Sequence, residues 1–164
     1  MTPVFGTGSG RRGLKRTTPE FLFLLAVVER VSLRSTDLAA LGLLTAATAA
    51  GLVLWPQLPG SMAVHFDAGG TPDTYVSRPV GMVLAPVIGV AGVGITRLAE
   101  RSDPSSDPRV VRATVLFVSG VVAYLQGLVL AYNLGHAVRL PFALAPAGIA
   151  SVALVGYALV RDPP

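Results

Sequence analysis

The sequence predicts an all-α, multi-pass membrane protein with four transmembrane helices and a short helix at the membrane surface ahead of them. First, 52% of the 164 residues are hydrophobic and only 13% are charged, whereas soluble domains carry about 25% charged residues. Second, the apolar residues gather in long runs. Third, arginines flank these runs, as expected for helices that are oriented in a bilayer.

Four apolar runs are long enough for helices that cross a hydrocarbon core about 30 Å thick. They cover residues 38–55, 80–96, 113–134 and 140–160, which places the membrane domain at 36–162. Trp55 fits an aromatic anchor at the membrane boundary. Pro86 and Pro146 fall inside spans, where neighbouring helices can satisfy the carbonyls that proline frees.

The residues ahead of the first span divide into two parts. Residues 1–16 are rich in glycine and basic residues, which predicts a disordered tail near an anionic leaflet. Thr17 and Glu20 have the spacing of a capping box, and an apolar run follows at 21–28. Eight residues of helix span roughly 12 Å, too little to cross a bilayer. Residues 17–35 are therefore expected to form an interfacial helix.

The arginines and lysines also predict the orientation. Eleven of the thirteen lie before residue 38, between residues 97 and 112, or at the C-terminus, and only Arg78 and Arg139 lie on the other side. By the positive-inside rule, both termini and the 97–112 loop are expected in the cytoplasm of a cell-membrane protein. Residues 56–79 and 135–139 are then expected outside.

The 56–79 segment carries the polar chemistry. It holds His65, Asp67 and Asp73, and His136 lies in the other outer loop. Imidazole and carboxylate groups suit zinc, so these four residues are candidate metal ligands. His-x-Asp is not a specific metal pattern, however, and ordinary turn chemistry explains the loop more simply. No metal and no cofactor is therefore expected.

Other catalytic patterns are missing from the sequence. It has no nucleophile elbow, no His-Glu-x-x-His and no phosphate-binding loop. It also has no cysteine and no interleaving of aromatic and basic residues typical of single-strand binding. Neither an enzyme nor a nucleic-acid-binding protein is expected. Gln126, near the middle of the third span, could line a pathway or bond a neighbouring helix.

The outer segment resembles the family called domain of unknown function 1648 (DUF1648). In that family a Leu-Pro, a His-Phe, a Gly-x-Pro-Asp and a Ser-Lys lead from the first membrane helix into the second. The residues that carry the resemblance are Leu58, Pro59, His65, Phe66, Asp67, Gly70, Pro72, Asp73, Ser77 and Arg78. Arg78 stands where lysine is usual. The stretch 127–135 is similar to the end of the family's third span.

The family includes the N-terminal part of SdpI-like membrane proteins. One branch of these gives immunity to a secreted toxin and holds a regulator at the membrane. The SdpI-like C-terminal half, with its Gly-Ile-Arg-Thr-Pro-Trp pattern, is missing from this sequence. The resemblance therefore implies family membership, and the family has no established biochemical activity.

Two functions are expected from these features together. The first is a binding, sensing or immunity component, in which the 56–79 loop is the recognition site for an extracellular peptide or small ligand. In that case the cytoplasmic segments meet lipid or a regulator. The alternative is a small transporter or metal-handling protein that uses His65, Asp67 and His136 on the outer face.

Overall fold

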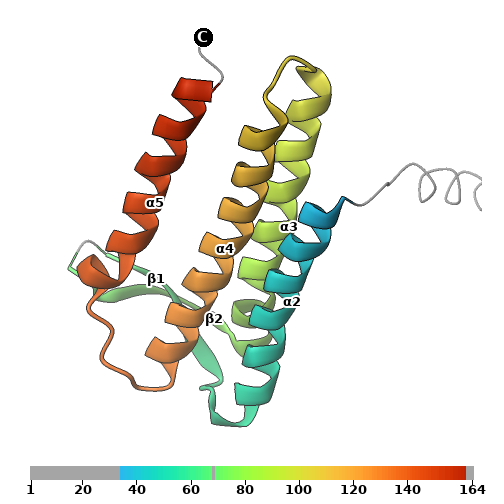
Figure 1. The fold of residues 1–164 in the computed structure, drawn as a ribbon. Helices are drawn as coiled ribbons and strands as arrows, with labels where there is room; N and C mark the ends of the chain where they lie inside the picture. The colour runs from blue at the N-terminus through green and yellow to red at the C-terminus, as the bar shows by residue number, and fades with distance from the viewer. Residues whose placement is uncertain (1–33, 68, 162–164) are drawn as a thin grey trace, which may run out of the picture. The chain divides into compact units, whose positions relative to one another are not determined.

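The computed structural model describes residues 34–67 and 69–161 of the chain. Figure 1 shows four long helices with a β-hairpin beside one end of them. The elements are α2 (Ser35–Leu54), the 3-10 turn η1 (Trp55–Gln57), β1 (Ser61–Phe66), β2 (Pro72–Ser77), α3 (Arg78–Ser102), α4 (Pro108–Asn133) and α5 (Leu140–Arg161). The predictions for residues 1–33, a basic tail and a surface helix, lie outside the described residues.

The four long helices are each long and apolar enough to cross a membrane, which confirms the all-α, multi-pass fold class. These helices are longer than the apolar runs from which they were predicted. The helix predicted at 80–96 continues to Ser102, and the one predicted at 113–134 begins at Pro108. The added turns carry charged residues, which a hydropathy window leaves out. Prolines stand in the first turns of α3 and α4, where no backbone N–H is needed.

The helices α2, α3 and α4 pack against one another, and α5 packs against α4 alone among them. Two glycines of α3 allow its close approach to its neighbours. A Cβ added to Gly89 would lie 2.5 Å from Leu44 Cδ2, and one added to Gly92 would lie 2.7 Å from Val118 Cγ1. Small residues at helix contacts are how membrane helices gain van der Waals contact.

The outward surface of the helices is apolar. Val87 of α3 is 61% exposed, and Val152 of α5 is 75% exposed. None of the described residues of α5 is buried. Side chains of this kind, exposed in such number, belong in contact with lipid rather than water.

Hydroxyl groups inside the spans bond to carbonyls of their own helix. Thr48 donates to Leu44 O, Thr96 to Gly92 O and Ser119 to Val115 O, at 2.9 Å in each case. A hydroxyl without a partner is costly in hydrocarbon. These local bonds let the polar residues lie within membrane-spanning helices.

The 56–79 segment contains a two-stranded antiparallel sheet. β1 and β2 pair from Ser61 opposite Ser77 to Phe66 opposite Pro72. The pairing is irregular on both sides of His65, where extra residues are accommodated. Valine, phenylalanine and tyrosine favour extended backbone on either side of a glycine-containing turn, which is why this loop forms strands.

Candidate functional site

The turn of the hairpin is built around Asp67. Its backbone N–H donates to Thr71 O at 2.9 Å, and its carbonyl accepts from Gly70 N at 3.0 Å. Its side-chain Oδ1 accepts from Thr71 N at 2.8 Å. Gly70 has a φ of +86°, a conformation that a residue with a Cβ rarely adopts. Asp67 and Gly70 therefore have structural roles in closing the turn.

The side chain of Asn133, at the end of α4, holds the hairpin on the bundle. Its Oδ1 accepts from Ala63 N and its Nδ2 donates to Ala63 O, each at 2.9 Å. Nδ2 also donates to Val129 O at 2.8 Å. The amide thus takes the place of a further strand along β1. Because Ala63 is 1% exposed, its peptide groups would otherwise be buried without partners.

The chain leaves α4 through a Schellman motif directly after Asn133. Gly135 N donates to Tyr132 O at 2.9 Å, and His136 N donates to Ala131 O at 3.1 Å. Gly135 has a φ of +86°, as the motif requires of the residue after the cap. This ending fixes Asn133 in the last turn of α4, where its amide meets β1.

Arg78, the first residue of α3, closes the other end of the hairpin. Its Nε donates to Pro59 O at 3.1 Å and its Nη1 donates to Trp55 O at 3.2 Å. The guanidinium also lies over the Trp55 ring, 5.3 Å from the centroid. Trp55 O also accepts from Leu58 N, so Arg78 adds a second donor there and ties the segment that follows α2 to the start of α3. Its role is to join the two helices.

A small apolar core lies beneath the hairpin. Leu58, Met62, Met82 and Leu130 are all 3% exposed or less and contact one another. They come from the segment after η1, from β1, from α3 and from α4. Leu58 of the family pattern is therefore a core residue. Together with Asn133 and Arg78, this cluster makes the hairpin a fixed part of the bundle.

The hairpin carries a pair of polar side chains that are largely exposed. His65 Nδ1 lies 2.7 Å from Asp73 Oδ1, and the two side chains are 69% and 45% exposed. The hydrogen bond with His65 lowers the pKa of the Asp73 carboxyl below its ordinary value. Thr74 Oγ1 donates to the same oxygen at 3.1 Å. Tyr75, on the same strand, is 57% exposed.

A cavity of about 280 Å³ lies between the hairpin, α4 and α5. His65 and Phe66 line it from β1, Leu128 and Tyr132 line it from α4, and Leu144 lines it from α5. The rings of Phe66 and Tyr132 meet edge to face with centroids 4.7 Å apart. Ligand sites are usually concave and mostly apolar with few polar groups, and this cavity has that composition.

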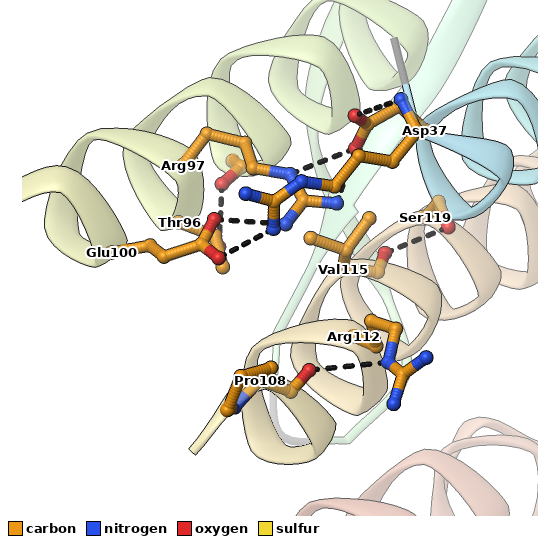
Figure 2. Close-up of polar contacts among 10 residues, drawn as sticks. Asp37, Thr96, Arg97, Glu100, Pro108, Arg112, Val115 and Ser119 are labelled. Atoms are coloured by element: carbon orange, nitrogen blue, oxygen red, sulfur yellow. Dashed lines mark hydrogen bonds and ion pairs between the residues drawn. The ribbon is translucent and has the colours of Figure 1, made fainter. Parts of the chain in front are cut away.

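A charged cluster joins α2 and α3 at the opposite end of the bundle. Figure 2 shows Arg97 of α3 reaching Asp37 of α2, with Glu100 beside it. Arg97 Nε and Nη2 donate to Asp37 Oδ1 at 2.8 and 2.6 Å, and Nη1 donates to Glu100 Oε2 at 3.0 Å. Glu100 also pairs with Arg34. Buried charges are tolerated when they are paired in this way.

Asp37 has a second role at this end. Its Oδ2 accepts from the backbone N–H of Arg34, which caps the start of α2. In the same view, Arg112 Nε donates to Pro108 O at 3.2 Å within the first turns of α4. The charges near residues 34–37 and 97–112 therefore also hold helix ends in place.

The four candidate metal ligands do not come together as one site. His65 pairs with Asp73, whereas Asp67 bonds to the backbone of its own turn. Over residues 34–67 and 69–161, no three histidine, aspartate or glutamate side chains gather in a way that could hold a metal ion. His136 contributes its backbone N–H to the end of α4.

Three polar residues have roles that sequence patterns did not predict. In the sequence, Asn133 is simply a polar residue at the end of a span, and Asp37 and Arg97 stand at the ends of apolar runs. Their partners are distant in sequence, so no local spacing could reveal them. Gln126 is buried in α4, and its Nε2 has no hydrogen-bond partner in the described part of the chain. Neither of the two roles expected for it is visible there.

Comparison with known proteins identifies one family. Residues 42–90 match the family described as "Domain of unknown function (DUF1648)". The match runs from α2 through the hairpin into α3, and it confirms the resemblance seen in the 58–79 segment. Comparisons with curated proteins and with solved structures found no match. The likeness to SdpI-like proteins has no support beyond the sequence pattern.

Proposed function

We propose that this protein, an integral membrane protein whose residues 42–90 belong to the DUF1648 family, is a binding component. Its recognition site is the 56–79 segment, and its ligand is an extracellular peptide. A sensing or immunity role is the physiological setting that the SdpI-like resemblance suggests. The proposed role is non-enzymatic, in line with the catalytic patterns that are missing from the sequence.

The distribution of arginine supports a cell-membrane protein with the hairpin outside and both termini in the cytoplasm. The hairpin end of the bundle carries Arg78, which is engaged with backbone carbonyls, and Arg139. The other end carries Arg34, Arg97, Arg101, Arg109, Arg112 and Arg161. Since that end would face the cytoplasm, the loop between α3 and α4 is where a cytoplasmic regulator would bind.

The observation that carries the proposal is the free edge of β2. β2 pairs with β1 on one side and with no other strand among the described residues. Ala63 turns its N–H and C=O to Asn133. In an antiparallel pair the residue directly opposite then turns its own peptide groups away from the partner strand. That residue is Tyr75, so its N–H and C=O lie along the unpaired edge.

An unpaired edge of this kind accepts an extended peptide as an additional strand. Main-chain hydrogen bonds to Tyr75 would provide affinity. The exposed side chains of His65, Asp73 and Tyr75 would provide specificity. Because the hairpin is fixed to the bundle by Asn133 and Arg78, binding there would cost little ordering of the receptor.

Photo-crosslinking in intact cells tests this proposal. A photoreactive amino acid at the exposed position Thr74 should give a peptide adduct, whereas the same residue at Tyr157 of α5 should give none. Tyr75→Pro removes the outward N–H and should abolish the adduct, and Tyr75→Phe should retain it. Identical products from positions 74 and 157, or an adduct that survives Tyr75→Pro, would contradict the proposal.

A further inference from the structure

The cavity between the hairpin, α4 and α5 is a separate feature from the free edge of β2. It lies where the helices end, because Tyr132 is next to the last residue of α4 and Leu140 is the first residue of α5. In a chain that spans a bilayer, helix ends lie at the boundary between hydrocarbon and water. The cavity therefore lies at that boundary.

The side of the cavity toward the bilayer is formed by two helices that are loosely joined. α5 packs against α4 and against neither α2 nor α3, and Figure 1 shows it standing apart from those two helices. Near the cavity, Tyr124 Oη donates to Ala143 O at 2.6 Å and links the two helices. Beyond this bond most residues of α5 are exposed and none is buried. A hydrocarbon chain can therefore reach the cavity from the lipid.

The size and lining of the cavity fit part of such a chain. Small-molecule sites usually measure about 300–1,000 Å³, so about 280 Å³ is enough for one chain segment and too little for a whole lipid. Val64, Leu128, Val129 and Leu144 provide apolar contacts on three sides. Burial of apolar surface is the interaction that such a lining offers.

Two basic side chains lie at or near the cavity, one on its lining and one next to lining residues in the chain. His65 lines the cavity. The Nδ1 atom of His65 is hydrogen-bonded to Asp73, which leaves Nε2 for another contact. Arg139 lies in the chain between Val138 and Leu140, two residues that line the cavity, and it is exposed. A cation at the membrane boundary attracts an anionic headgroup.

We propose that this cavity binds the chain of an anionic membrane amphiphile, with its headgroup beside Arg139 and His65. The chain enters between α4 and α5, and its end rests against Leu128 and Leu144. The site does not depend on peptide recognition at β2. An apolar chain between β1 and α5 would also contact Phe66, so its presence would stabilise the hairpin by binding the folded state.

The test uses purified protein in nanodiscs of zwitterionic lipid and a dodecyl phosphate probe with a diazirine at its chain end. Crosslinks should concentrate on residues 64–66, 125–132 and 138–144, and unlabelled dodecyl phosphate should compete for them. Leu144→Trp and Val64→Trp, which fill the cavity from two sides, should reduce labelling to that of the exposed face of α5. Val152→Trp, on that exposed face, should leave labelling unchanged.

Arg139 is tested with a pair of probes. Arg139→Gln should weaken labelling by the phosphate probe about five-fold and leave labelling by the matching diazirine dodecanol unchanged. An even distribution of crosslinks over the exposed helix faces, insensitive to both cavity-filling variants, would overturn the proposal. Equal labelling by the two probes in the unaltered protein would overturn the anionic headgroup while retaining the chain site.

Discussion

Replacement of Asn133 by leucine tests how the hairpin is held on the bundle. Leucine has the same branching and the same number of side-chain heavy atoms as asparagine, with somewhat bulkier methyl groups, and it loses the hydrogen bonds with Ala63 and Val129. Two peptide groups of Ala63, a residue that is 1% exposed, are then left without partners. Each unsatisfied buried group costs about 1–2 kcal/mol, so the hairpin should lose about 2–4 kcal/mol of local stability.

Hydrogen exchange measured by mass spectrometry on residues 61–66 reads this loss directly. A change of about 2–4 kcal/mol corresponds to exchange that is roughly thirty-fold to a thousand-fold faster. Asn133→Asp keeps an oxygen that can accept from Ala63 N but loses both donated bonds, so its effect should be intermediate. If the hydrogen exchange of residues 61–66 stays unchanged in a folded Asn133→Leu protein, Asn133 does not hold the hairpin on the bundle.

Three further predictions concern the helix contacts, the charged cluster and the pair formed by His65 and Asp73. Gly92→Val should lower the thermal unfolding midpoint in detergent, at a cost of about 1–3 kcal/mol, whereas Gly94→Val should have little effect because no atom lies within 4 Å of a Cβ there; equal shifts would contradict the packing. Asp37→Leu should cost about 3 kcal/mol by leaving Arg97 with Glu100 but without its partner on α2. Adding Arg97→Leu should recover part of that loss, so strictly additive losses in the same assay would contradict the pairing. His65→Ala should raise the pKa of Asp73 toward its ordinary value, as measured by carbon NMR of the carboxyl. Because the pKa of Asp73 is lowered in the folded state, the pair stabilises the hairpin above the ordinary pKa. This stabilisation is lost as the pH falls through the lowered pKa. A pKa that does not move would show that His65 is not the cause.

The helices could be predicted from the sequence because hydrocarbon imposes one requirement on every residue of a span: its side chain must be apolar, or its polar groups must find partners within the protein. The runs at 38–55 and 140–160 meet it without any charged side chain. Ends of helices were less predictable. Asp37 and Arg97 lie inside α2 and α3 because they neutralise each other across the bundle, and a pairing over that distance in sequence has no local pattern.

The 56–79 segment could be recognised as related to DUF1648, but the roles of its residues could not be assigned. Asp67 and Gly70 are turn residues, Leu58 is a core residue, and Arg78 joins two helices. His65 faces Asp73 because of the irregular strand pairing around it, which depends on three-dimensional register. Asn133 looks like any polar residue at a helix end until β1 lies beside it.

The orientation of the four helices is the claim on which the proposed function rests, and it can be measured directly. The chain contains no cysteine, so Tyr75→Cys on the hairpin and Ser105→Cys in the α3–α4 loop each provide a single label site. A membrane-impermeant maleimide applied to intact cells should label position 75 at once and position 105 only after lysis. Labelling of position 105 but not position 75 in intact cells would contradict the account.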